Sequence, residues 1–485
     1  MKKITAWICA ALVVLLSAAF AGCEKNEKVN TRYEITAEYV PENRTLAGAV
    51  KVTFENDTEN VLSCLKFLLY PNAYRENALY NPVSSTRKDS AYYNGKNYGE
   101  MVISSVNGAK NWEVMGEDEN VLCVFLLRPL YPEERVVLDI GFITKVAHVN
   151  HLTGVTKKTV NLANFFPILC GIKHGGFVET VYYDKGNPFF LDCADYKLAL
   201  TLPKEYALVS SGEIVSEHML ESKKVHTVCA INARNFAVAL STDYQTLTQE
   251  IKGTKLFYSY YADENAVQTL ELIADCFKYY SEMFGKYPYK TYTVAQTGLA
   301  LPLDAATATG LTLFSDKTEK EEKEHALARA VAKQWWGMSV GSDCIENAWQ
   351  DEGLSEYAAV TFFENRERYG LKREQMMREI LTEYRSFYDV YGSVLGRTDT
   401  KMTRHLKDYV SEHEYRCISL LKSTVMFDTL RKSVGDKTFF TALRRYYADN
   451  RFKIAYPAHL LSAFEAAGTD TSGFFDSFLT GKGIL

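Results

Sequence analysis

The sequence lacks several patterns that would assign a chemistry at once. Its 10 cysteines include no CxxC pair. No stretch is strongly basic, and the formal net charge is -5. These absences argue against a zinc ribbon, a disulfide framework and a nucleic-acid-binding protein. No internal repeat, low-complexity tract or second membrane segment is evident in the sequence.

The N-terminal segment, MKKITAWICAALVVLLSAAFAGC, has the layout of a secretory signal. Two lysines precede an apolar run from Ile4 to Phe20, which is short for a membrane span. The residues that follow end in Cys23 and resemble a bacterial lipobox, in which the cysteine is diacylated and becomes the mature N-terminus. Two acyl chains are enough for stable anchoring in a lipid bilayer.

We therefore expect a signal peptide over residues 1–22, and a lipidated cysteine and tether over residues 23–30. The protein is then secreted and held at the outer face of the bacterial cytoplasmic membrane, or at the outer membrane of a two-membrane cell. A plain signal peptide with a chance cysteine is the alternative interpretation.

Two hydrophobic periods divide the rest of the chain. Up to about Thr246, apolar and polar residues alternate, as in Tyr33, Ile35, Ala37 and Tyr39, which predicts antiparallel strands. From about Glu264 onward, amphipathic segments such as NAVQTLELIADCFKYYSEMFG and STVMFDTLRKSVG predict helices. The expected fold class is α+β, with an antiparallel, saddle-like β-rich domain at 31–248 and a mainly helical domain at 249–485. Most of the cysteines beyond Cys23 stand in apolar runs and are expected to be small core residues.

The segment QWWG…WQDEGLSEY, which begins at Gln334, is the most specific pattern in the chain. It resembles the aminopeptidase-N-type gluzincins, zinc metallopeptidases in which HExxH-QWWG is followed by WxNEGxxxY. Eighteen residues lie between Lys333 and Glu352, the separation that this family keeps between its second His ligand and its Glu ligand. The resemblance extends from about residue 31 to the C-terminus. It implies an N-terminal β-domain followed by a thermolysin-like helical domain.

Carried over residue by residue, the resemblance implies a zinc site that has lost its ligands. The first His ligand falls on Arg329, the catalytic Glu on Ala330 and the second His on Lys333, while the third ligand remains as Glu352. Two further family positions are replaced: Thr307 stands about where the Glu that binds the substrate amine belongs, and Leu420 stands in place of the catalytic Tyr.

A cationic side chain has no lone pair to give to zinc, so the sequence predicts no metal, no cofactor and no catalytic residue at these six positions. One hypothesis is that Arg329 and Lys333 form a buried ion-pair cluster with Glu352 in place of the metal. The other is that both cations extend into a wet cleft.

Other candidate residues give no second site. His148 and His151 lie in an expected surface loop, while His405 and His413 stand without a carboxylate motif. His325 is four residues before Arg329, but the residue one turn on is not a ligand.

Three functions stay open at this stage. The first is a catalytically inactive, surface-anchored protein that binds peptides or a protein partner. The second is an active zinc aminopeptidase with unrecognised ligands, and only this alternative needs zinc. The third is a structural envelope protein. An open cleft at the degenerate site favours binding, and a filled one favours the structural role.

Overall fold

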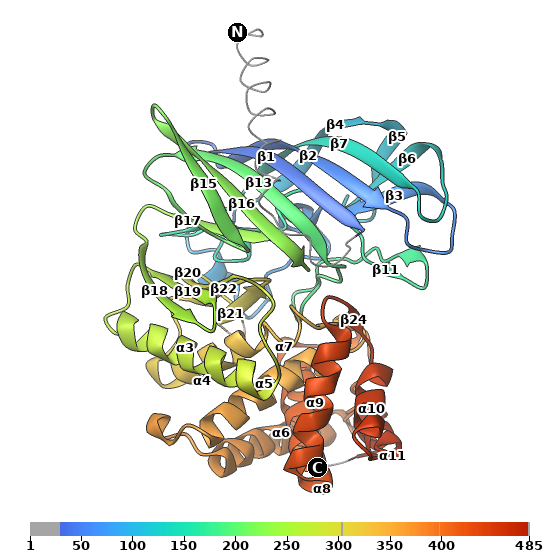
Figure 1. The fold of residues 1–485 in the computed structure, drawn as a ribbon, viewed down its shortest axis with the longest axis vertical. Helices are drawn as coiled ribbons and strands as arrows, with labels where there is room; N and C mark the ends of the chain where they lie inside the picture. Colours follow the sequence, from blue (N-terminus) through green and yellow to red (C-terminus); the bar gives the residue numbers. More distant parts are fainter. Residues whose placement is uncertain (1–29, 302–303, 397, 484–485) are drawn as a thin grey trace.

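The computed structural model describes residues 30–301, 304–396 and 398–483, so the expected signal segment and Cys23 lie outside the described residues. Figure 1 shows a β-rich N-terminal half stacked on a C-terminal half built around helices. The expected α+β fold class is confirmed. Among the helices that the structure describes, none has the length and apolar composition of a membrane span.

The largest sheet of the N-terminal half has seven strands in the order β15-β16-β13-β1-β2-β7-β4. Strand β1 alternates buried and half-buried residues along its whole length, as its sequence predicts. Every neighbouring pair is antiparallel except β1 and β13, which run parallel, so the expected all-antiparallel arrangement is wrong at this one pair. The strands are β1 (Thr31–Val40), β2 (Thr45–Glu55), β4 (Glu100–Asn107), β7 (Arg135–Lys145), β13 (Ala194–Pro203), β15 (Glu213–Leu220) and β16 (Lys223–Ala233).

Smaller sheets complete this half and share one apolar core with the large sheet. One has the order β10-β3-β6-β5, another the order β14-β17-β9-β8, and β11 pairs with β12. Their strands are β3 (Leu62–Leu68), β5 (Ala109–Met115), β6 (Val121–Leu130), β8 (Thr153–Val155), β9 (Val160–Ala163), β10 (Ile168–Leu169), β11 (Ile172–Lys173), β12 (Gly176–Phe177), β14 (Ala207–Ser210) and β17 (Ala237–Ser241); the short helix α2 is Lys88–Ala91.

The C-terminal half begins with a five-stranded mixed sheet that the helical periodicity did not predict. Its order is β18-β19-β20-β22-β21, with β18 (Gln245–Ile251), β19 (Thr254–Tyr260), β20 (Thr291–Thr297), β21 (Ala305–Ala308) and β22 (Leu311–Ser315). All seven residues of β20 are buried. A strand covered on both faces shows no alternation of apolar and polar residues, so this strand was not predicted. The sheets change between Ser241 and Gln245, just before the expected boundary at 249.

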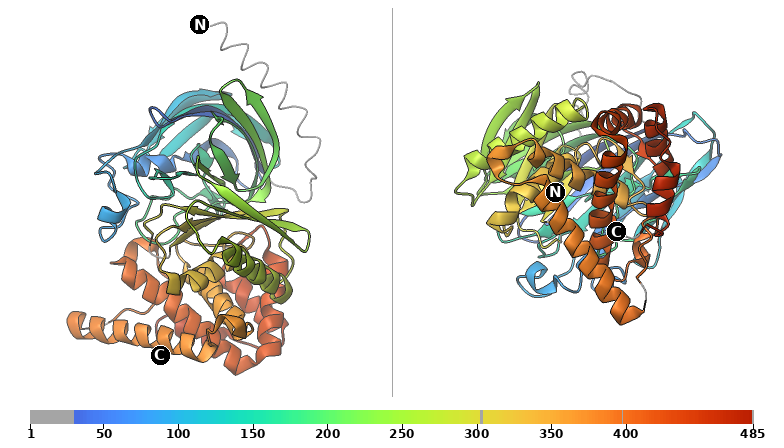
Figure 2. Two further views of the ribbon diagram at one scale, coloured as in Figure 1. Left: turned by 90° about the vertical axis from the view of Figure 1, so that its left-hand side faces the viewer. Right: turned by 90° about the horizontal axis from the view of Figure 1, so that it is seen from below.

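Helices fill the rest of the chain, and the expected helical segments are present. They are α3 (Ala266–Met283), α4 (Lys320–Ala332), α5 (Trp349–Glu364), α6 (Arg373–Leu395), α7 (Glu412–Tyr415), α8 (Ser423–Val434), α9 (Asp436–Asn450), α10 (Pro457–Ala466) and α11 (Ser472–Leu479). A π-helical segment, Arg416–Lys422, joins α7 to α8, and β23 (Gly341–Ser342) pairs with β24 (Ile454–Ala455). Figure 2 shows α6 projecting from the body of this half.

One buried arginine ties the two halves together. Arg234, next to the end of β16, donates from Nη1 to the Leu191 carbonyl at 2.9 Å and from Nη2 to the Lys453 carbonyl at 2.9 Å. Its Nε donates to the Met338 carbonyl at 3.3 Å. A charged side chain buried this deeply needs such partners, so Arg234 fixes the β-rich half above the helices that carry the candidate site.

Candidate functional site between the two halves

The candidate site lies where α4 and α5 pack against each other. Arg329 and Ala330 stand in the last turn of α4, Lys333 caps that helix, and Glu352 stands in the first turn of α5. The pair Trp335 and Trp336, together with Trp349 and Tyr357, is fully buried around this contact. Their burial holds the two helices in fixed register.

All six family positions named from the sequence line one cavity of about 150 Å³. Thr307 comes from the edge strand β21, Leu420 from the π-helical segment, and Arg329, Ala330, Lys333 and Glu352 from α4, its cap and α5. The N-terminal half closes the opposite wall with Pro82, His151, Tyr182 and Phe189, among others. The cavity is therefore an inter-domain space at the place where the resemblance put the active site.

Lys333 is the centre of the charged groups in this cavity. Its Nζ lies 2.9 Å from Asp351 Oδ2 and 3.0 Å from Glu352 Oε1, and only 13% of its side chain is exposed. Burial alone would lower the pKa of Lys333, but the two carboxylates raise it above its ordinary value. Lys333 is therefore a buried ammonium that bridges two acidic side chains.

The two carboxylates around Lys333 are not fully compensated by one cation. Burial and the neighbouring charge of Glu352 raise the pKa of Asp351, against the lowering effect of Lys333. Glu352 Oε1 also accepts a hydrogen bond from the Tyr415 hydroxyl at 3.3 Å. Glu352 Oε2, in contrast, is buried and has no hydrogen-bond partner among the residues that the structure describes. An acceptor on the cavity wall is thus left for a donor from outside the chain.

Arg329 pairs with a different carboxylate from the one expected. Its Nε lies 3.5 Å from Glu356 Oε2, one turn beyond Glu352 on α5, and His325 Nε2 lies 2.9 Å from Glu356 Oε1. Burial would raise the pKa of Glu356, but His325, Arg329 and Arg416 hold it at about 2. The hypothesis of a single cluster on Glu352 is therefore correct for Lys333 and wrong for Arg329. Arg329 and Lys333 are one turn apart, and each lies beside a different carboxylate of α5, Glu356 and Glu352 respectively.

The histidines of the expected surface loop are placed differently from the prediction. His151 is buried, lines the cavity and has its Nδ1 2.6 Å from the Tyr74 hydroxyl. Burial lowers the pKa of His151 to about 4, so the ring is neutral near pH 7. His148 is half-buried against Tyr93. Aromatic residues brought in from another part of the chain cover this loop, which the local sequence does not reveal.

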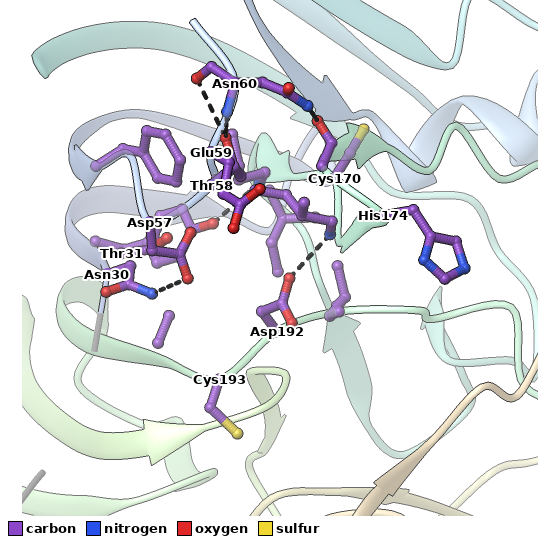
Figure 3. A pocket seen from close by; sticks show the side chains of 18 of the residues that line it. Asn30, Thr31, Asp57, Thr58, Glu59, Asn60, Cys170, His174, Asp192 and Cys193 are labelled. Carbon is purple, nitrogen blue, oxygen red and sulfur yellow. Dashed lines mark hydrogen bonds between the residues drawn. The ribbon is translucent and has the colours of Figure 1, made fainter. Parts of the chain in front are cut away.

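A larger cavity of about 500 Å³ lies within the N-terminal half, away from these residues. Figure 3 shows Asn30, Asp57, Thr58, Glu59 and Asn60 on one side of it and Asp192 on another. Two of its carboxylates are engaged by the protein: Asn30 donates to Asp57, and Asp192 Oδ2 accepts from the Ile172 backbone N–H at 3.0 Å. None of the six family positions reaches it.

Comparisons with known proteins agree with this geometry. Residues 268–478 match the Peptidase family M1 domain. The M1 zinc metallopeptidase from Deinococcus radiodurans has a similar structure, with a TM-score of 0.65, 17% identity and 94% of each chain covered. A mutant two-domain M1 zinc metallopeptidase bound to L-tryptophan gives a TM-score of 0.63 and 16% identity, with 96% of this chain and 97% of that chain covered.

A third similar structure is a mutant of the Deinococcus radiodurans enzyme bound to a Tyr-Ser-Ala substrate, with a TM-score of 0.62, 16% identity and 94% of each chain covered. No curated protein matches. Residues 268–478 are thus similar to the Peptidase family M1 domain, and the chain shares the two-domain fold of M1 zinc metallopeptidases. The resemblance to the aminopeptidase-N-type gluzincins is confirmed at this level.

Proposed function

We propose that the protein is a non-catalytic member of the M1 peptidase fold that binds the amino-terminal end of a peptide, either free or presented by a protein partner. The observation that carries this proposal is the Lys333 ammonium, which lies between Asp351 and Glu352 on the wall of the inter-domain cavity. An ion pair occupies the place where the M1 resemblance puts a metal ion.

The side chains at this place do not fit zinc. Zinc is held by thiolate, imidazole or carboxylate donors, usually at least three from the protein. Arg329 and Lys333 offer none, and Ala330 gives no carboxylate to act as a base on water. The carboxylates that remain, Asp351 and Glu352, already accept from Lys333. No step of a metal-assisted hydrolysis can be built from these groups.

The size of the cavity and the acceptor on its wall suit a small cationic group. A space of about 150 Å³ takes a group the size of a benzene ring, that is, one residue of a peptide. Within the described part of the chain, Glu352 Oε2 is an acceptor without a partner, and a ligand ammonium can donate to it. The L-tryptophan and Tyr-Ser-Ala complexes of the similar structures support a ligand of this class.

The same proposal includes anchoring through acylated Cys23 at the outer face of the cell envelope. The FAGC sequence supports it, since the cysteine follows an apolar signal-like run. Radiolabelled palmitate should enter the wild-type chain and not Cys23→Ala. Equal labelling of the two would remove the lipid anchor from the proposal.

The test of binding uses the chain from Glu24 onward, which keeps every described residue. Calorimetry should detect peptides with a free amino terminus and show at least about tenfold weaker binding of the same peptides when acetylated, since a charge-assisted hydrogen bond contributes about 1.5–3 kcal/mol. Glu352→Gln should lose that discrimination, whereas Glu205→Gln, at an exposed site in the β-rich half, should keep it.

Two other outcomes contradict the proposal in different ways. Zinc-dependent release of N-terminal residues from these peptides would show an active aminopeptidase with ligands outside the degenerate site. Absence of both hydrolysis and binding would favour the structural envelope role.

A further inference from the structure

A second group of metal-ligand side chains lies outside the inter-domain cavity. Glu383 on α6, His413 on α7 and Cys417 in the π-helical segment have ligand atoms that all lie within 4.8 Å of one another. Cys417 Sγ is 3.6 Å from His413 Nε2 and 3.9 Å from His413 Nδ1. Cys417 is buried, Glu383 is half-buried and His413 is exposed, so the group opens to solvent on one side.

Local structure explains why the three side chains meet. The Ser411 side chain accepts from the Glu414 backbone N–H at 3.1 Å and so starts α7. His413 and Cys417 are four residues apart in the continuous helix that follows, which places them on one face. Phe387, one turn from Glu383 on α6, packs edge-on against the His413 ring with centroids 5.8 Å apart. This contact turns the imidazole toward α6 and Cys417.

The distances are close to those of a tetrahedral zinc site. Zinc–ligand bonds of 2.0–2.3 Å at tetrahedral angles put neighbouring ligand atoms about 3.4–3.6 Å apart. The sulfur–imidazole distance of 3.6 Å already meets this geometry, and the Glu383 oxygen has to move by at most about 1.3 Å to complete it. Thiolate and imidazole are donors that select zinc over magnesium or calcium, which prefer oxygen.

We propose that Glu383, His413 and Cys417 bind one zinc ion, with a water molecule as the fourth ligand. The segment His413–Cys417 reads HEYRC, so two ligands one turn apart flank a glutamate. That glutamate does not face the site: Glu414 Oε2 accepts from the Val410 backbone N–H at 2.7 Å, and Oε1 lies 2.9 Å from Arg404 Nη2. Because Glu414 is held away from the three ligands, it does not serve as a base on a metal-bound water, and the site holds zinc in a structural role. The Cys417 thiol proton is released to solvent as the sulfur binds.

Arg416 competes with the metal for Glu383. The two side chains form an ion pair, with 35% and 38% of their side chains exposed. Exposed pairs of this kind contribute little to stability, so the zinc ion can displace the guanidinium at small cost. Arg416 also lines the inter-domain cavity, so its release would change the charge at the cavity rim.

Cobalt(II) is a suitable probe, because a cobalt–thiolate bond gives a charge-transfer absorption in the near ultraviolet. After chelator treatment, the chain from Glu24 onward should bind one cobalt per chain with this absorption, and zinc should displace it. Cys417→Ser should abolish the absorption, and His413→Gln, at an exposed position, should weaken binding at least about tenfold. Cys64→Ser, at a half-buried position on β3, is the matched control and should behave as the wild type. Arg416→Gln should bind the metal more tightly.

Absence of the absorption in the wild-type chain would overturn the proposal, and so would its persistence in Cys417→Ser. Circular dichroism of each variant checks folding, and His413→Gln still tests the site if Cys417→Ser does not fold. The site shares no ligand with the inter-domain cavity, so its failure would leave the peptide-binding proposal standing, and the reverse also holds.

Discussion

Replacing Lys333 by methionine tests the central feature of the candidate site. Methionine keeps most of the apolar stem and removes the ammonium, so Asp351 and Glu352 become two adjacent buried carboxylates without their cation. We expect this variant to fold less stably than the wild type and to take up a proton at the site.

The magnitude follows from the two contacts. At an effective dielectric constant of 20, each contact near 3 Å contributes about 5 kcal/mol of attraction, which the burial of three charges offsets by several kcal/mol per ion. Removing one partner of such a buried pair typically costs about 3–5 kcal/mol. For a unit the size of the C-terminal half, this corresponds to a fall in Tm of roughly 10 °C.

Thermal unfolding followed by tryptophan fluorescence is the appropriate assay, because Trp335, Trp336 and Trp349 are buried beside the site. The deficit should shrink between pH 8 and pH 5, since one carboxylate of the variant can then be protonated. Lys333→Met combined with Glu352→Gln should recover much of the loss. A change in Tm below about 2 °C at pH 8 would refute the buried ion-pair interpretation and favour side chains that extend into water.

Two further predictions concern the neighbouring contacts. The pKa of Glu356 is lowered from 4.5 to about 2 in the folded protein, so its stabilising share is complete above pH 4.5 and is lost as the pH falls toward 2. That share amounts to roughly 3 kcal/mol, and Glu356→Gln should flatten the acid side of the stability profile measured by urea unfolding; an unchanged acid side would contradict the shift. At Gly353 on α5, an added Cβ would lie 2.3 Å from Ser423 Oγ and 2.5 Å from Ser423 Cβ. Gly353→Ala should therefore cost about 1–3 kcal/mol through overpacking, and Gly353→Ala with Ser423→Gly should recover part of it in thermal unfolding; equal losses would point to another cause.

The sequence was sufficient to predict six positions of the cavity wall and the Lys333–Glu352 pair, but not the residues that the N-terminal half adds to that wall. Spacing placed Lys333 and Glu352 correctly, because the motif around the tryptophans fixes the register of two packed helices. The pairing of His325 and Arg329 with Glu356 was not predicted, although His325, Arg329 and Lys333 stand four residues apart in the sequence. The matching spacing of Glu352 and Glu356, also four residues apart, was a signal in the sequence that could have predicted these pairs. Asp351 was missed because it precedes the expected ligand and matches no helical period.

The remaining differences between the sequence-based predictions and the structure come from tertiary contacts. The parallel pairing of β1 with β13 joins segments more than 150 residues apart, and no local pattern encodes it. His151 is buried by Tyr74 and Tyr182, which come from other parts of the N-terminal half. Glu383 reaches His413 across α6 and α7, although the HEYRC spacing was a sequence signal that could have drawn attention to Cys417.

A measurement of zinc in the purified chain has to distinguish two places, the inter-domain cavity and the group Glu383, His413 and Cys417. Zinc in the purified chain would not by itself indicate an aminopeptidase, since Glu383, His413 and Cys417 offer a ligand set outside the inter-domain cavity. Zinc that disappears with Cys417→Ser belongs to that surface site and leaves the cavity to its ion pairs. Zinc that survives Cys417→Ser and disappears with Glu352→Gln would instead place a dication beside the Lys333 ammonium, and the repulsion would move Lys333 away from its carboxylates.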